Sequence, residues 1–67
     1  MFEYNNKYLR VYGFKNIGNI NENQAVFIYK DKRVIINGIN INVINLIDKS
    51  CDIDGVINRI EVEYNYD

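Results

Sequence analysis

The 67-residue sequence contains no histidine, proline, threonine or tryptophan. Without histidine, the chain has no imidazole to act as a base, to complete a Ser-His or Cys-His dyad, or to ligate a metal. The one cysteine, Cys51, cannot form an internal disulfide, and we interpret it as a small apolar strand residue in a reducing compartment. No apolar run approaches the length of a membrane span, and the N-terminus lacks the apolar region of a signal peptide. We therefore expect a cytoplasmic protein.

Charge of either sign is low, with 9 acidic and 8 basic residues and a net charge of −1. Only Lys30, Lys32 and Arg33 cluster among the basic residues, and Asp31 lies between them, which is typical of a charged turn. Because no basic field is present, we predict no nucleic-acid partner. Ser50 has no candidate base nearby in the sequence, and no glycine-rich phosphate loop is present. We predict a protein without enzymatic activity or cofactor.

What the sequence has in abundance is β-branched residues: 12 Ile and 6 Val, against 2 Leu and 1 Ala. These side chains suit a pleated sheet and lose rotamer freedom in a helix. We predict a single all-β domain over residues 1–67, with residues 1–7 loosely ordered at their start. The expected fold is a small antiparallel meander of about six short strands in a twisted roll or sandwich, without substantial helix. The expected strands lie near 8–12, 24–30, 33–37, 39–46, 50–54 and 56–64, with a short extended piece at 17–20.

Two dipeptides predict tight hairpin turns. Asn37-Gly38 fits a type I′ turn, which would pair residue 36 with residue 39, and Asp54-Gly55 would likewise pair 53 with 56. The first register places five apolar residues on one face: Val34, Ile36, Ile39, Ile41 and Val43. The second gathers six residues on one face: Cys51, Ile53, Val56, Ile60, Val62 and Tyr64.

A third hairpin, turning at Asp31-Lys32, would join 24–30 to 33–37. Ala25, Phe27 and Tyr29 would then share the face of Val34 and Ile36. Val26, Ile28 and Ile35 would form a second apolar face. Sheets that are apolar on both faces are normally covered on both, and either another layer of the same chain or a partner chain would cover this second face. We hypothesise homo-oligomerisation through this second face or by strand addition at an open sheet edge. The predicted interaction surface comprises Val26, Ile28 and Ile35 of the second face, together with Tyr12 and Tyr64.

One stretch matches the spacing of a calcium-binding loop. Oxygen-bearing side chains stand at the first, third, fifth and twelfth positions around Gly55: Ser50, Asp52, Asp54 and Glu61. Against this interpretation, the first position is serine rather than aspartate, and the flanking segments are strand-like where the motif requires helices. A β-hairpin with a solvated acidic face explains the same residues. We predict no metal ligands, and keep a calcium-binding module at 50–61 as a third hypothesis.

The glycines also carry a resemblance that covers roughly residues 8–64. The residues that carry it are Gly13-Phe14-Lys15-Asn16-Ile17, Val34 and Ile36 before Gly38, then Gly38-x-x-Ile41-x-Val43-x-x-Leu46, and Gly55-x-Ile57-x-x-Ile60. This pattern resembles the YabP and YqfC family of small sporulation proteins of endospore-forming bacteria. The sequence departs from the family pattern at Lys32, where a turn glycine is usual, and in a shorter connection between Leu46 and Gly55.

The resemblance implies a non-enzymatic role in spore envelope or coat formation in the mother cell, beside a membrane-protein partner. The chain has six tyrosines, and tyrosine supplies large contact area at low entropic cost. We therefore expect a small β interaction or assembly module that binds proteins. The alternative is a phage- or plasmid-encoded small inhibitor that binds a host protein.

Overall fold

A computed structural model describes residues 2–4 and 8–65, and within them the chain forms six strands and no helix. The strands are β1 (Phe2–Tyr4), β2 (Leu9–Tyr12), β3 (Asn16–Asn21), β4 (Gln24–Ile28), β5 (Lys32–Ile47) and β6 (Ser50–Tyr64). The predicted all-β class is confirmed. In the predicted N-terminal segment 1–7, residues 2–4 form β1, and the other residues lie outside the described part of the chain.

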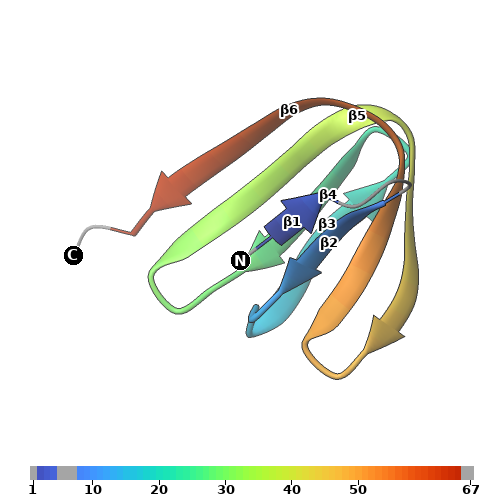
Figure 1. Ribbon diagram of the computed structural model, residues 1–67. Coiled ribbons are helices and arrows are strands. Elements are labelled where there is room, and N and C mark those ends of the chain that lie inside the picture. The colour runs from blue at the N-terminus through green and yellow to red at the C-terminus, as the bar shows by residue number, and fades with distance from the viewer. Residues whose placement is uncertain (1, 5–7, 66–67) are drawn as a thin grey trace.

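All neighbouring strands pair antiparallel in one sheet with the order β1-β2-β6-β5-β4-β3. Strands β3 to β6 follow one another as a meander, and β1 and β2 add to the other side of β6. The two longest strands, β5 and β6, bend together near their middles, so that the sheet folds back over itself (Figure 1). One bent hairpin thus contributes to both halves of a small roll.

The bend lies where sequence patterns predicted two hairpin turns, and both of those turn predictions were wrong. Asn37-Gly38 and Asp54-Gly55 lie inside continuous strands, and Ile39 pairs with Val56 rather than with Ile36. Register shifts surround this corner, after Asn37 and between Ile39 and Asn42. Asn40 takes a left-handed φ of 56° within the second shift, a conformation that asparagine tolerates better than most residues.

The glycines at the corner allow two backbones to approach closely. A Cβ on Gly38 would lie 2.0 Å from the carbonyl oxygen of Val56. A Cβ on Gly55 would lie 2.5 Å from the carbonyl oxygen of Asn40, and Gly55 also has a φ of 118°. A side chain at either position would collide with backbone, which cannot swing aside as a flexible side chain can. Glycine is therefore needed here for close packing of a bent ladder.

The actual reversals lie elsewhere in the sequence. Ile47 pairs with Ser50, so the β5–β6 hairpin turns at Asp48 and Lys49, with Asp48 at a φ of 57°. The two segments predicted to pair, 24–30 and 33–37, do pair, but in a different register. Ile28 pairs with Arg33, which shifts the ladder by two residues from the register that a turn at Asp31-Lys32 would give. An offset of two leaves every side chain on its expected face.

The core lies between the two halves of the folded sheet. Its buried residues come from both halves and from the connections: Leu9, Val11, Phe14, Ala25, Phe27, Tyr29, Val34, Ile36, Ile41, Cys51 and Ile53. The Phe14 and Phe27 rings pack with centroids 5.0 Å apart. The predicted inner positions Ala25, Phe27, Tyr29, Val34 and Ile36 are thus confirmed.

The corner bulges overturn two of the predicted face assignments. Ile39 and Val56, expected on the apolar faces, are 54% and 61% exposed, because the register shifts break the alternation of side chains at the corner. Ile41 is buried, and Val43 packs against the core beyond the bulge. The two apolar faces predicted from the Asn37-Gly38 and Asp54-Gly55 registers therefore hold only away from the corner.

Backbone and side-chain hydrogen bonds tie the two halves of the roll together. Between the halves, the Tyr29 hydroxyl donates to the carbonyl of Tyr12 at 2.8 Å. Within one half, the Gly13 N–H donates to the carbonyl of Lys49 at 2.9 Å and extends the β2–β6 ladder. At the corner, the N–H groups of Gly38 and Ile41 donate to carbonyls of the β3–β4 turn. The bent segment of β5 is thereby fixed against its neighbours.

We predict that Gly38→Ala and Gly55→Ala each lower the free energy of unfolding by about 2 kcal/mol or more, through backbone overlap and, at Gly55, a strained φ. Gly18→Ala is the matched control, because its nearest atoms belong to the Val26 side chain at 3.3 Å and its φ is not left-handed. Urea unfolding measures all three. Equal losses for the corner and control variants would contradict the corner's role.

Candidate interaction surfaces

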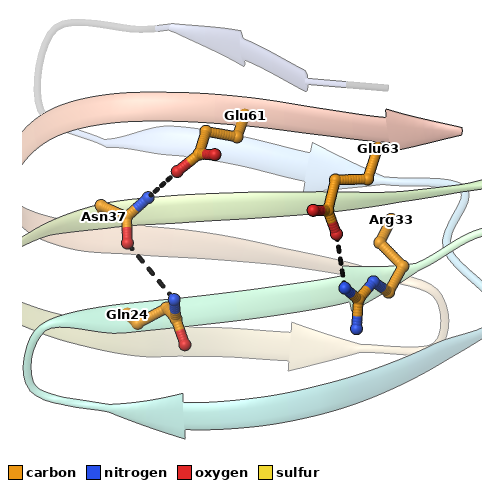
Figure 2. A network of polar contacts seen from close by, with 5 residues as sticks. All are labelled: Gln24, Arg33, Asn37, Glu61 and Glu63. Atoms are coloured by element: carbon orange, nitrogen blue, oxygen red, sulfur yellow. Dashed lines mark hydrogen bonds and ion pairs between the residues drawn. The ribbon is translucent and has the colours of Figure 1, made fainter.

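A polar network lies on the outer face of the sheet formed by β4, β5 and β6. The Gln24 side-chain amide donates to the side chain of Asn37 at 3.3 Å, and the Asn37 amide donates to Glu61 at 3.1 Å (Figure 2). Arg33 pairs with Glu63 on the same face. These residues alternate along their strands with the buried positions, which places them outside. Together they form a ladder of cross-strand polar contacts, which we call the outer network.

The predicted second apolar face lies beside this outer network. Val26 and Ile35 pair across β4 and β5, and Ile28 follows on the same face of β4. Val26 is only 8% exposed, and Ile28 and Ile35 are half-buried. Gly18 of β3 lies against Val26 and Ile28, because a Cβ built there would be within 3.5 Å of both side chains. Part of the cover expected for this face is therefore supplied by the chain itself.

The two tyrosines of the predicted interaction surface are both exposed but stand on different strands. Tyr12 ends β2, and Tyr64 ends β6, where it pairs with Lys32 of β5. The arm of β6 that carries Tyr64 pairs with no part of β2, whose partners are Ser50–Ile53. The five predicted residues therefore do not form one continuous patch: three lie together on the outer face of β4 and β5.

A second polar centre occupies the outer face of the other half of the sheet. Asp52 is 3% exposed and lies between Arg10 of β2 and Ile44 of β5. Arg10 Nε donates to Asp52 Oδ1 at 3.1 Å, and Asn45 Nδ2 donates to Asp52 Oδ2 at 2.9 Å. Asn45 reaches this carboxylate from a bulge of β5, where its φ is 53°. Both oxygens of this buried charge are thus satisfied.

The surroundings of Asp52 favour its ionised form. The hydrogen bonds from Arg10 and then Asn45 lower the pKa of the Asp52 carboxyl, and partial desolvation acts in the opposite direction. On the inner face of the same strand, burial raises the pKa of the Cys51 thiol to about 11, with a smaller contribution from the Asp52 carboxylate. A thiol with so high a pKa is protonated near neutral pH, in keeping with the predicted role of Cys51 as a core residue.

The residues of the calcium-loop pattern are spread along β6 rather than gathered in a loop. Ser50, Asp52 and Asp54 succeed one another along extended chain, and Glu61 lies beyond the corner, bonded to Asn37. The Asp52 carboxylate is occupied by Arg10 and Asn45. Within residues 2–4 and 8–65, no three acidic, cysteine or histidine side chains gather as metal ligands would.

The sequence analysis hypothesised strand addition at an open sheet edge but did not locate that edge, which among the described residues includes the part of β6 beyond the corner. The six residues Arg59–Tyr64, which we call the β6 arm, pair with β5 on one side, and β2 does not reach them on the other. The alternation of charged and apolar residues in this arm is visible in the sequence. The predicted turn at Asp54-Gly55, however, would have paired the arm with residues 45–50 instead of with Lys32–Asn37 of β5.

Comparison with protein-family models, curated proteins and solved structures found no match for this chain. In the part of the chain that the structure describes, no helix has the length and apolar character needed to cross a membrane.

We predict that Asp52 makes stability depend on acid pH. Because its pKa is lower in the folded than in the unfolded state, its contribution is full above the ordinary value near 3.8 and is lost as pH falls through the folded value. Asp52→Asn should therefore lose less unfolding free energy between neutral and strongly acidic pH than the unaltered protein. Asp54→Asn, at an exposed position of the same strand, is the control. Parallel acid losses for Asp52→Asn and the unaltered chain would contradict the prediction.

We also expect calcium to leave the melting temperature unchanged, because the Asp52 carboxylate already accepts two side-chain hydrogen bonds. A ligand that binds only the folded state must raise the melting temperature with concentration. Thermal unfolding in rising calcium, with magnesium as the control cation, provides the measurement. A calcium-specific rise, abolished by Asp54→Asn, would revive the calcium-binding hypothesis.

Proposed function

We propose that this chain is a non-enzymatic protein-interaction module that acts in spore envelope or coat formation, beside a membrane-protein partner. The observation that carries the interaction role is the outer face of β4, β5 and β6. There, the half-buried Ile28 and Ile35 border the charged and amide side chains of the outer network. Interfaces commonly combine an apolar centre with a polar rim.

The sporulation setting is supported by the glycine and apolar pattern of the sequence, which resembles the YabP and YqfC family. Gly38 and Gly55, two residues of that pattern, are the positions where a side chain would collide with backbone at the corner. These two glycines of the pattern are therefore residues that the backbone fold requires. The resemblance thus supports a fold in common with the family more than a common chemical activity. In this proposal the protein acts in the mother cell of a sporulating bacterium.

Affinity capture from a sporulating culture tests this proposal. We expect the unaltered chain to retain a membrane protein of the spore envelope, and Ile35→Lys to lose it, because a charge would then stand in the apolar centre of the outer face. Ile47→Lys is the matched control, since Ile47 is highly exposed beside the β5–β6 turn and away from this face. Circular dichroism would confirm that both variants fold.

Two results would contradict the proposal. Retention of the same membrane protein by Ile35→Lys would remove the outer face from the interaction. Capture of a host enzyme or regulator, with no spore-envelope protein, would favour the phage- or plasmid-encoded inhibitor instead.

A further inference from the structure

Among residues 2–4 and 8–65, the β6 arm, Arg59–Tyr64, has a strand partner on one side only and is an open strand edge. Its residues pair with Lys32–Asn37 of β5 in an unbroken register, whereas β2 pairs only with Ser50–Ile53 at the other end of β6. In Figure 1 the arm runs along the outside of the sheet with β5 on one side and no described strand on the other. Such an edge can pair with a further strand.

The hydrogen-bond pattern identifies which backbone groups of the arm are directed outward. The Asn65 N–H donates to the carbonyl of Asp31 at 2.9 Å, so the backbone N–H and carbonyl groups of Asn65 point toward the side of the arm on which β5 lies. Because alternate residues of an antiparallel ladder point the same way, Glu63 and Glu61 also bond toward β5. The N–H and carbonyl groups of Ile60, Val62 and Tyr64 therefore point away from β5, toward the open edge.

A bond on the far side of β5 supports this assignment. The Tyr29 N–H donates to the carbonyl of Lys32 at 2.8 Å, so Lys32 directs its carbonyl toward β4. Lys32 is the cross-strand partner of Tyr64. The pair Lys32–Tyr64 is thus one whose backbone groups turn away from each other, as the alternation requires.

The side chains of the arm leave this edge unprotected. Natural edges are commonly blocked by proline, by a bulge, by charged side chains, especially lysine, or by a charged residue that points inward. The arm has no lysine, and its charged residues Arg59, Glu61 and Glu63 all stand on the outer face. Between Arg59 and Tyr64 the sequence has no proline, the register with β5 has no shift, and the inward positions are apolar. Val62 and Tyr64 are 37% and 54% exposed on this inward side.

We propose that the β6 arm pairs antiparallel with the β6 arm of a second copy of this chain. This inference rests on the proposed interaction role and names one surface and one occupant for it. The occupant follows from charge: Arg59 and Glu63 stand two residues on either side of Glu61, so the outer charges of the arm complement those of an identical arm turned by a half rotation.

The register of this pairing is restricted by the backbone. Outward-directed residues must oppose outward-directed residues, which requires the ladder to be centred on a residue rather than between two residues. Centring on Glu61 or Val62 aligns the most residues of the arm. Centring on Val62 would oppose Glu61 to Glu63 of the second copy twice and form no pair of unlike charges, which is less favourable than one such like pair at the axis. Centring on Ile60 would draw in residues 56–57, which lie beyond the register shift at the corner.

Centring on Glu61 gives favourable side-chain pairs on both faces of the arm. Arg59 then opposes Glu63 of the second copy, and Ile60 opposes Val62 of the second copy, with each pair formed twice. The two Glu61 side chains meet at the axis, but each already accepts a hydrogen bond from Asn37 at 3.1 Å and pairs with Arg59 at 2.9 Å. These partners offset the like charge at the centre.

Sedimentation equilibrium of the full chain tests the proposal through charge exchange. We expect a dimer for the unaltered chain, and at least about a tenfold weaker dimer for Arg59→Glu or Glu63→Arg alone, because either variant opposes like charges twice. An equimolar mixture of the two variants should restore the dimer, since each contact across the mixed pair again joins unlike charges. Misfolding of a single variant would not be rescued by mixing.

A backbone variant tests the edge independently of charge. Val62→Pro removes an N–H that points toward the open edge, whereas Glu61→Pro removes one that bonds to β5. We expect Val62→Pro to remain folded by circular dichroism but monomeric, and Glu61→Pro to lose stability. Ile28→Glu, on the outer face of β4, should leave the dimer intact.

Three outcomes overturn the inference, and the first two are an unaltered chain that stays monomeric at its highest soluble concentration and a dimer that the mixture of charge variants does not restore. A dimer lost in Ile28→Glu but kept in Val62→Pro would also overturn it, and would assign the contact to the outer face. A monomer that still captures a spore-envelope membrane protein would refute this inference alone. A dimer that captures none would refute the proposed function alone.

Discussion

The architecture depends on the close approach of two backbones at the corner of β5 and β6. Gly38 lies against the carbonyl of Val56 and Gly55 against the carbonyl of Asn40, at distances that leave no room for a Cβ. This approach lets one hairpin bend sharply and supply strands to both halves of the roll. A 67-residue chain has little surface to bury, and the bend allows β2 and β4, on opposite sides of that hairpin, to share a single core.

The sequence predicted the strand content and most inward-facing residues, because alternation of apolar side chains survives errors in turn placement. Ala25, Phe27, Val34 and Ile36 are buried as expected, even though their hairpin is offset by two residues. Asn37-Gly38 and Asp54-Gly55 were misplaced for a physical reason. A tight turn and a bent, bulged ladder both favour glycine beside a small polar residue, and local sequence does not distinguish them.

The ambiguity between a tight turn and a bent ladder also determined how much of the candidate site could be predicted from the sequence. Val26, Ile28 and Ile35 were correctly placed on one face, since β4 and β5 pair as expected there. That Val26 would be covered at Gly18 could not be foreseen, because it depends on an irregular stretch of β3. The open edge at Arg59–Tyr64 emerges only when β6 is one long strand, because only then does it extend beyond the reach of β2.

The burial of inward-facing side chains changes along β6 with the number of neighbouring strands. Cys51 and Ile53 are fully enclosed where β6 has a strand on each side, whereas Val62 and Tyr64 are exposed where it has one. The inward apolar residues of the arm thus continue the core to an edge that no other described strand covers. For a domain of this size, added burial at an edge strengthens a marginal core. In the proposed dimer an identical arm supplies that burial and opposes Arg59 to Glu63, while Ile28 and Ile35 on the outer face of β4 and β5 stay free for a different protein.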